Sequence, residues 1–514
     1  MSGILLIYPP LVKACEPPIG IARLAAAVNQ LGVACETYDA NLESQVALLH
    51  TAVDTTDPRL RQAVRTREHH LFLLRDQQGY ENFDRYKLAV NRLNYLLAAA
   101  GQAWQSQITL ADYAHADLQP VCSADLLQIA DQPQRSPFYD VLLKGLQSRI
   151  KHRSFAYVGL SINYLSQALS AFAIIGILKT ILPEAKIVAG GGLITSWMRR
   201  PGWRNPFNGL IDHLVEGPGE HALTALLSGR PAGCGFPTPD FSGLMHLPYF
   251  APGAIIPYST SFGCHWNRCA FCPEKAERQK FQPVPADQVR TDLATLVQRY
   301  QPILLHLTDN SLSPRMLHVL AEHPPAAPWY GFTRITPVLA EPDMAHALHL
   351  AGCRMLKLGV ESGDALVLQE MHKGHTPELA ERVLRNLHAA GIATFVYLLF
   401  GTPWEDERAA QATLQFVERN HRAITFINPA LFNMPIEPET DLQPFYGGDL
   451  SLYTAYEHAS DWSRQRVRRF LDREFRRHAA VAEILRRTPP AFTSNHAPLF
   501  TSLWLTRDKQ HPSS

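Results

Sequence analysis

Short apolar segments alternate with helix-like segments along most of this 514-residue chain, and this alternation limits the folds that it can adopt. The first apolar run covers residues 3–8, stops at two prolines and is followed by a helical pattern over 19–31. Further strand-like runs lie at 33–39, 155–163, 186–189 and 213–216. Repeated strand–helix units build parallel sheets with helices on both faces. The pattern therefore predicts an α/β protein whose first domain is a doubly wound, Rossmann-like sheet.

Two segments interrupt this alternation before a second series begins. Residues 42–150 are rich in polar and helix-forming residues and indicate a helical insertion in a first domain that covers 1–227. Residues 228–254 hold many glycines and prolines, which is typical of a linker. Strand candidates then recur at 255–260, 303–308, 329–333, 355–360, 394–400 and 425–429. They predict a full or partial (β/α) barrel over 255–440, followed by a helical region over 441–514.

Composition excludes several classes of partner and location. The net charge of +1 gives no electrostatic case for nucleic acid or an anionic membrane. The amino terminus has no basic start, its apolar run is too short for a signal peptide, and no segment is long enough for a membrane span. The eight cysteines are scattered irregularly, unlike a secreted disulfide framework. We therefore expect a cytoplasmic protein.

Three of these cysteines, Cys264, Cys269 and Cys272, share one short loop after the strand candidate at 255–260. Thiolates are soft ligands, and three of them in a loop suit a metal or an iron–sulfur cluster. Three ligands leave one iron of a four-iron cluster open for a substrate or cosubstrate. A zinc site completed by His265 is the alternative, although zinc sites more often pair two C-x-x-C knuckles and no second knuckle exists here. A disulfide is disfavoured in a reducing compartment.

Polar side chains recur at the ends of the later strand candidates. Asp309 ends the first, Arg334 the second, the pair Glu361 and Ser362 the third, and a Gly-Thr-Pro turn the fourth. Each motif alone is typical of a turn, a helix cap or a solvated loop. Their recurrence at successive strand ends, all after the cysteine loop, favours one shared site at the carboxyl edge of the barrel.

The cysteine loop resembles that of the radical S-adenosylmethionine enzymes, with four residues instead of the usual three between the first two cysteines. The polar strand ends look like the barrel of that superfamily over about 255–430. The resemblance implies a [4Fe–4S] cluster held by Cys264, Cys269 and Cys272. It also implies that S-adenosylmethionine is bound by Asp309 at its amine, by Arg334 at its carboxylate and by Glu361 at its ribose or amine, with help from Ser362. Lys373 could reach the cosubstrate, but an exposed lysine is expected. Cys353 is expected to be a small buried residue rather than a further ligand.

The first domain resembles the cobalamin-binding domain that precedes the barrel in many of these enzymes. The similar motifs are Tyr8-Pro-Pro10, 16–21, 159–163, 189–192 and 216–220. The resemblance implies a cobalamin contacted by Ser161, with Gly190, Gly191 and Gly192 clearing space for the macrocycle. The Asp-x-His-x-x-Gly loop that supplies a lower axial histidine in many cobalamin proteins is absent, and the loop 9–18 holds no histidine. A fold retained without the cofactor, with glycines that serve sheet packing alone, stays open.

Taken together, the resemblance implies a cobalamin-dependent radical S-adenosylmethionine enzyme that transfers a methyl group to an unactivated carbon of an unidentified small molecule. Such an enzyme needs a one-electron reductant such as flavodoxin or ferredoxin. One alternative is another radical reaction, such as rearrangement, cyclisation or oxidation, without methyl transfer. A second is a non-catalytic iron–sulfur or cobalamin-binding regulator. The basic segment 464–478 is interpreted as a solvated helix that packs on the barrel, rather than as a surface for an acidic partner.

Overall fold

A computed structural model describes residues 3–51, 55–230, 235–436, 447–456, 458 and 461–505. The chain forms two compact units. The first contains Met1–Pro252 and Pro438–Leu452, and the second contains Gly253–Glu437 and Tyr453–Ser514. No helix within the described ranges combines the length and apolar character that crossing a membrane requires.

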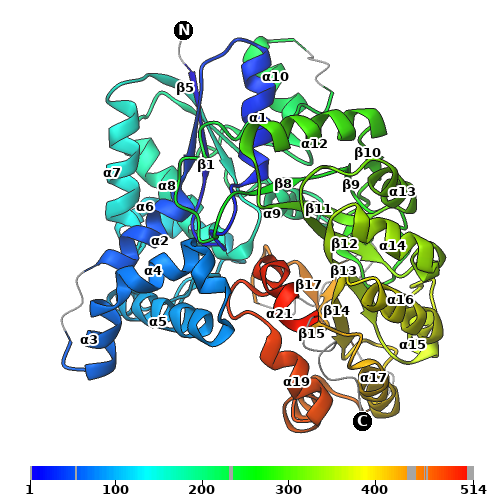
Figure 1. The fold of residues 1–514 in the computed structure, drawn as a ribbon. Coiled ribbons are helices and arrows are strands. Elements are labelled where there is room, and N and C mark those ends of the chain that lie inside the picture. Colours follow the sequence, from blue (N-terminus) through cyan, green and yellow to red (C-terminus); the bar gives the residue numbers. More distant parts are fainter. Residues whose placement is uncertain are drawn as a thin grey trace. The chain divides into compact units, whose positions relative to one another are not determined.

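The first unit is built on a five-stranded parallel sheet with the order β2-β1-β5-β6-β7. Figure 1 labels β1 and β5 of this sheet. The strands are β1 (Gly3–Tyr8), β2 (Cys35–Asp39), β5 (Phe155–Ser161), β6 (Lys186–Gly190) and β7 (His213–Leu214). Helix α1 (Ile19–Gln30) packs with α10 (Gly219–Ser228), and α8 (Leu165–Ile181) packs with α6 (Ser123–Asp131). The strand order reverses between β1 and β5, which confirms the predicted doubly wound fold and places its switch point there.

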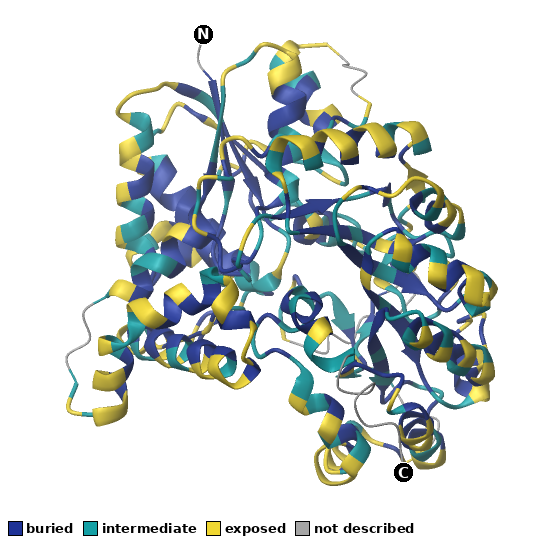
Figure 2. Ribbon diagram, in the orientation of Figure 1, coloured by how far each residue is buried: buried dark blue, intermediate teal, exposed yellow. Residues whose placement is uncertain are grey.

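The apolar runs become buried strands because both faces of this sheet are covered. Ile4, Leu5, Leu6 and Ile7 of β1 are fully buried, and α8 is buried along most of its length. Figure 2 shows the strands in dark blue, whereas yellow exposed positions gather on the outer helices. Beyond β6, the helix α9 (Gly192–Met198) starts directly at the glycine turn.

Between β2 and β5 the chain forms a mostly helical segment. It contains α2 (Ala40–His50), α3 (Pro58–Arg65), α4 (Arg67–Arg75), α5 (Phe83–Gly101), α6 and α7 (Tyr139–Ile150), with short 3-10 turns at Gln77–Tyr80, Gln102–Trp104 and Pro133–Arg135. A hairpin of β3 (Ser106–Ile108) and β4 (Tyr113–His115) lies within it, which the sequence did not predict. The segment starts at Ala40, because Asp39 at the end of β2 also caps α2 by accepting from the Leu42 amide.

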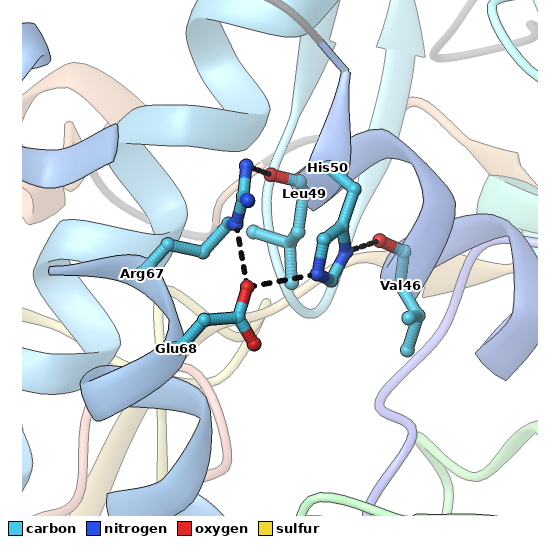
Figure 3. A network of polar contacts seen from close by, with 5 residues as sticks. All are labelled: Val46, Leu49, His50, Arg67 and Glu68. Carbon is cyan, nitrogen blue, oxygen red and sulfur yellow. Dashed lines mark hydrogen bonds and ion pairs between the residues drawn. The ribbon is translucent and has the colours of Figure 1, made fainter. Parts of the chain in front are cut away.

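The end of α2 and the start of α4 are joined by a small polar network (Figure 3). His50 lies between the carbonyl oxygen of Val46, 2.7 Å from Nδ1, and the Glu68 carboxylate, 3.0 Å from Nε2. Arg67 donates to the same carboxylate and to the Leu49 carbonyl oxygen, at 3.0 and 3.3 Å. Hydrogen bonding to Arg67 lowers the pKa of Glu68. The carboxylate is 70% exposed, so this network orients the two helix ends and adds little stability.

Residues 235–252 pack onto the first unit, so the predicted linker over 228–254 is wrong for this described part. Phe241 and Phe250 are fully buried. The amide of Phe250 donates to the Ala14 carbonyl oxygen at 2.8 Å, and the Tyr249 hydroxyl donates to the Asp39 carboxylate at 2.8 Å. Glycine and proline content marked an irregular segment correctly, but its aromatic side chains anchor it.

The second unit is a partial barrel of six parallel strands in the order β15-β14-β13-β12-β11-β8. The strands are β8 (Ile255–Tyr258), β11 (Leu304–Leu312), β12 (Trp329–Arg334), β13 (Cys353–Glu361), β14 (Ala393–Phe400) and β15 (Phe426–Leu431). The helices between them are α12 (Ala286–Tyr300), α13 (Pro314–Glu322), α14 (Pro342–Leu350), α15 (Ala365–Glu370), α16 (Pro377–Ala389) and α17 (Glu407–Asn420). A 3-10 turn at Pro337–Ala340 precedes α14. All six predicted strands are present, and Cys353 is buried as expected.

The carboxyl-terminal residues of the second unit are mainly helical. They form α18 (Arg464–Phe470), a π-helical turn (Leu471–Phe475), α19 (Ala479–Arg487), α20 (Thr493–His496), a 3-10 turn (Ala497–Phe500) and α21 (Thr501–Leu505). A two-stranded ribbon of β16 (Met434–Pro435) and β17 (Tyr453–Thr454) precedes them. Val467, Leu471 and Phe475 are buried, and the Phe475 ring meets Phe400 of β14 at 4.9 Å. The basic segment therefore packs on the barrel, as interpreted.

Candidate functional site

The cysteine loop follows β8 at the carboxyl edge of the barrel. It runs from β9 (Ser261–Phe262), which pairs with β10 (Gln282–Pro283), to α11 (Pro273–Ala276). Cys269 is buried, and Cys264 and Cys272 are half-buried. Burial raises the pKa of the Cys272 thiol to about 11. Within the described residues, no three Cys, His, Asp or Glu side chains are arranged as a ready set of metal ligands, so neither the three thiols nor His265 form one here.

Asp309 supports the start of this loop. Its carboxylate accepts hydrogen bonds from the Thr260 amide at 3.0 Å, the Thr260 hydroxyl at 2.7 Å and the Ser261 hydroxyl at 2.6 Å. Burial raises its pKa, and these donors oppose that shift. The carboxylate therefore fixes the chain just before the first loop cysteine. This structural use differs from the amine-binding role expected for Asp309.

Replacing Asp309 with alanine is expected to lower the free energy of unfolding by about 3 kcal/mol, because the buried Thr260 amide loses its acceptor. An asparagine at this position is not a full substitute, since its amide nitrogen donates where the carboxylate accepts. Asp309→Asn should therefore fall between wild type and Asp309→Ala. Urea denaturation of the three proteins measures this order. Equal stability of wild type and Asp309→Ala would show that the carboxylate does not brace the loop.

Arg334, at the end of β12, contacts the loop directly. Its Nη1 donates to Sγ of Cys269 at 3.3 Å, and its Nη2 donates to the Lys373 carbonyl oxygen. The guanidinium carbon lies 4.4 Å from the centroid of the Trp266 ring. The side chain is only 4% exposed. Arg334 therefore connects a loop cysteine to the backbone of Lys373.

Glu361 and Lys373 form a buried ion pair next to Arg334. Lys373 Nζ lies 2.8 Å from Oε1 of Glu361, and the two side chains are 4% and 10% exposed. Nζ also lies 5.4 Å from the centroid of the Phe271 ring in the cysteine loop. The expectation that Lys373 is exposed is therefore wrong. Glu361 has φ +68°, an uncommon conformation for a residue other than glycine that often marks functional sites.

Ser362 is directed to a different neighbour. Its hydroxyl lies 3.2 Å from the Thr413 hydroxyl of α17 and accepts from the Asp364 amide at 3.1 Å. The adjacent Gly363 amide donates to the same Thr413 hydroxyl at 2.9 Å. Ser362 thus shapes the turn after β13. The structure brings Arg334 and Glu361 together through Lys373, and it places the Ser362 hydroxyl beside Thr413 of α17.

His375 is a buried residue of the site that sequence reasoning missed. Neither ring nitrogen has a hydrogen-bond partner of good geometry. Burial, followed by the charges of Lys373 and Arg334, lowers its pKa to about 3, opposed by the backbone of Val360. His375 is therefore neutral. In the sequence, a link between His375 and the site could be suspected only from its position two residues after Lys373, in a His-Lys-Gly-His stretch.

Glu405 is a second residue that was missed, in the turn after β14. Its Oε2 accepts from the Gly401 amide at 2.5 Å and from Trp462 Nε1 at 3.1 Å, while Oε1 is buried without a partner. Burial raises its pKa to about 7, against the lowering effect of these two donors. The carboxyl holds the Gly-Thr-Pro turn at the same edge of the barrel as Arg334 and Glu361.

The raised pKa of Glu405 predicts a pH dependence of stability. The folded protein binds a proton at Glu405 up to about pH 7, whereas the unfolded chain releases it near 4.5, so stability is lost as pH rises between these values. The loss is about 3 kcal/mol, because each pKa unit corresponds to about 1.4 kcal/mol. Glu405→Gln mimics the protonated group and should gain stability relative to wild type from pH 5 to pH 8. Urea denaturation across this range should show the gain; parallel pH curves would contradict it.

In the first unit, the switch point between β1 and β5 carries Ser161. Its buried hydroxyl accepts from Asn163 Nδ2 at 3.1 Å, and Asn163 Oδ1 accepts from the Gly192 amide at 3.0 Å. Gly191 has φ +103°, and a Cβ there would lie 2.5 Å from the Ile162 carbonyl oxygen, so local packing alone requires this glycine. At Gly190 and Gly192 a Cβ would meet only ordinary contacts, at 3.4 and 3.6 Å.

The loop 9–18 at this switch point is fixed by hydrogen bonds to its backbone. Gln167 donates to the Pro9 carbonyl oxygen at 2.8 Å, and the Val12 amide donates to Asn41 at 2.9 Å. Gln45 donates to the Val12 carbonyl oxygen at 2.5 Å. Leu11, Ala14 and Cys15 are buried. The loop is therefore held in place by the protein, without a histidine.

The cysteine loop therefore lies beside the buried side chains of Arg334 and Lys373, at the carboxyl edge of the partial barrel. Residues 258–417 match the family model of the Radical SAM superfamily. This range contains the cysteine loop, Asp309, Arg334, Glu361 and Glu405. The chain therefore carries a radical SAM domain, which confirms that part of the predicted resemblance.

A curated protein and several solved structures are also similar to this chain. Over 193 residues it is 26% identical to a bacteriochlorophyllide d C-12(1)-methyltransferase of Chlorobaculum tepidum, a match of 35% of this chain and 41% of that protein. The fold is similar to that of the radical S-adenosylmethionine methyltransferase TsrM of Kitasatospora setae, solved with cobalamin and a [4Fe–4S] cluster bound. That likeness has a TM-score of 0.51, with 16% identity over 85% of this chain and 74% of TsrM.

The fold is also similar to that of the cobalamin-dependent S-adenosylmethionine radical enzyme OxsB, solved with aqua-cobalamin bound. The TM-score is 0.52, with 15% identity over 83% of this chain and 53% of OxsB. At these identities the likeness concerns the fold. It confirms the predicted architecture of a doubly wound α/β domain followed by a partial (β/α) barrel. This chain spans about half the length of OxsB and less than half of the Chlorobaculum relative.

Proposed function

We propose that this radical SAM enzyme uses a [4Fe–4S] cluster, S-adenosylmethionine and cobalamin to transfer a methyl group to an unactivated carbon of a small molecule. The observation that carries the proposal is the contact of the buried Arg334 with Cys269, next to the Glu361–Lys373 pair, within the radical SAM domain. The methyltransferase names of TsrM and of the Chlorobaculum relative support the reaction class.

The chemistry of the donor set fits an iron–sulfur cluster. Cys264, Cys269 and Cys272 would supply three thiolates, which leaves one iron of a four-iron cluster open. Arg334 would hold the loop at Cys269, because its Nη1 lies 3.3 Å from the sulfur. Asp309 holds Thr260 and Ser261 and so fixes the approach of the loop to the barrel edge.

The charges at the barrel edge fit S-adenosylmethionine, which carries an amine, a carboxylate and a sulfonium. Arg334 and Lys373 would complement the carboxylate, and Glu361 would complement the amine or the ribose hydroxyls. Lys373 joins Arg334, Glu361 and Ser362 as a candidate contact of the cosubstrate, because its buried ammonium group lies beside the Glu361 carboxylate. S-adenosylmethionine bound there would supply radical chemistry after a one-electron reduction, and these side chains would bind it, orient it and exclude water.

A cobalamin in the first unit would lie at the switch point, where doubly wound sheets bind their ligands. Ser161 would be its polar contact, and Gly190 and Gly192 would leave it space, since the protein itself needs no glycine at either position. The loop 9–18 offers no histidine to the metal. We propose that the cofactor is held without an axial histidine from this loop. A flavodoxin or a ferredoxin would supply the electrons.

Isotope transfer tests the proposed function without knowledge of the substrate. The full-length protein is reconstituted anaerobically with iron, sulfide and hydroxocobalamin, and then incubated with dithionite and methyl-labelled S-adenosylmethionine. We expect bound corrinoid, label in the corrinoid fraction and 5′-deoxyadenosine in solution. Deoxyadenosine without bound corrinoid would favour another radical reaction. A complete cluster with no conversion of the cosubstrate would favour a non-catalytic regulator and overturn the proposal.

A further inference from the structure

Trp266 lies in the stretch between Cys264 and Cys269 that is one residue longer than the usual spacing. Asn267, next to it, has φ +47°, a left-handed conformation that asparagine tolerates better than most residues. The indole Nε1 donates a hydrogen bond of 2.9 Å to the carbonyl oxygen of His372, which is 106 residues further along the chain. The expanded stretch thus attaches the cysteine loop to the turn at 371–374.

This turn is shaped to receive the indole ring. Gly374 has φ +76°, and a Cβ added there would lie 2.6 Å from Cη2 of Trp266, so ring and side chain exclude one another. The Ala270 amide makes a second connection by donating to the Met371 carbonyl oxygen at 3.0 Å. Phe271 packs against an apolar cluster that contains Met371. Three successive parts of the loop therefore contact one turn.

Arg334 links this attachment to a loop cysteine. Its guanidinium carbon lies 4.4 Å from the centroid of the Trp266 ring, within the range of a cation–π contact. Nη2 donates to the Lys373 carbonyl oxygen in the same turn, and Nη1 reaches Sγ of Cys269 at 3.3 Å. The position of Nη1 at the sulfur thus depends on the ring and on the turn together.

We infer that Trp266 is a positioning residue that fixes the expanded cysteine loop to the turn at 371–374 and holds Arg334 against the sulfur of Cys269. The inference rests on the proposed function, because it assigns Cys269 to the cluster. Hydrogen bonds and charge at ligand sulfurs set the reduction potential of an iron–sulfur cluster. A cation at this sulfur stabilises the more negative, reduced form, so Trp266 raises the potential at which the cluster accepts an electron.

The midpoint potential and the EPR spectrum of the reduced cluster test this role in the reconstituted full-length protein. Trp266→Ala should shift the potential to a more negative value and change the spectrum, because Arg334 loses its support. Trp266→Phe keeps a ring and should shift the potential less. Trp104→Ala, at a half-buried tryptophan of the first unit, is the control and should behave as wild type. Circular dichroism and iron content are measured for each variant.

Gly374→Ala provides an independent perturbation, because its methyl group displaces the ring from the other side. It should reproduce the shift in the wild-type background and add nothing to Trp266→Ala. A wild-type potential and spectrum in folded Trp266→Ala, or shifts that simply add in the double variant, would overturn the inference. If Trp266→Ala does not fold, Trp266→Phe and Gly374→Ala decide by the same comparison. A wild-type protein that assembles no cluster overturns the proposed function, and the inference with it.

Discussion

Cys269→Ala is expected to abolish the formation of 5′-deoxyadenosine, with a loss of at least about a thousandfold, because the proposed radical chemistry belongs to the cofactor that Cys269 would hold. Cys264→Ala and Cys272→Ala should act similarly, since each removes one of three ligands and none is spare. Iron and sulfide content after anaerobic reconstitution, together with the visible absorbance of the cluster, measures whether the cluster assembles. Product analysis with dithionite and S-adenosylmethionine measures the formation of 5′-deoxyadenosine.

The matched control is Cys122→Ala, which removes a half-buried cysteine from the first unit. It should assemble the cluster and form deoxyadenosine as wild type does. Full cluster content in any of the three loop variants would show that the cluster takes its ligands elsewhere. A loss of iron in Cys122→Ala as well would mean that the assay reports general damage to the protein.

Lys373→Met should lower the free energy of unfolding by about 3–5 kcal/mol, because it leaves Glu361 buried without its positive partner. The pair is well suited to this test, since its side chains are only 4% and 10% exposed. The double variant Glu361→Gln with Lys373→Met removes both charges and should recover much of the loss. Urea denaturation of the wild type, the two single variants and the double variant gives the interaction free energy as a thermodynamic cycle.

An exposed ion pair in the same unit is the comparison for that cycle. Arg476 and Asp472 lie 2.8 Å apart on the carboxyl-terminal segment, with side chains 47% and 63% exposed. Arg476→Met should cost less than about 1 kcal/mol, because solvent screens such pairs. A Lys373→Met variant that is no less stable than Arg476→Met would contradict the buried pairing of Glu361.

The strands and the overall architecture could be predicted because buried parallel strands carry a strong local signal. The run at 3–8 becomes β1 with four fully buried aliphatic side chains, and the six barrel strands also lie where apolar runs were found. The strand ends followed from the same pattern, so Arg334 and Glu361 were placed at one edge correctly. The position of a residue along a strand depends on the local pattern of apolar residues, so it can be predicted from the sequence.

The partners of those residues could not be predicted, because they depend on contacts between distant segments. Lys373 follows a helix in a polar stretch, and only the return of that turn to β13 buries it against Glu361. The hydrogen bonds of Asp309 to Thr260 and of Ser362 to Thr413 also join segments that are far apart in the sequence. The segment at 235–252 has no helical or strand-like pattern of apolar residues. It packs onto the first unit through the buried side chains of Phe241 and Phe250.

The additional residue between Cys264 and Cys269 illustrates the same limit. From sequence it was an unexplained irregularity in the spacing of the cysteines. In the folded chain, the longer stretch lets Trp266 reach Gly374 and cover Arg334. The number of residues between two cysteines limits the distance between their sulfur atoms. It does not show which distant residues the intervening side chains contact, because those contacts form only in the folded chain.

The EPR spectrum of the reduced cluster, recorded before and after addition of S-adenosylmethionine, tests the central claim most directly. Three cysteine ligands would leave one iron open, so binding of the cosubstrate at that iron should change the spectrum of the reconstituted wild-type protein. Prolonged incubation with dithionite should then yield 5′-deoxyadenosine. A complete four-iron cluster whose spectrum does not respond to S-adenosylmethionine, with no product formed, would contradict the account.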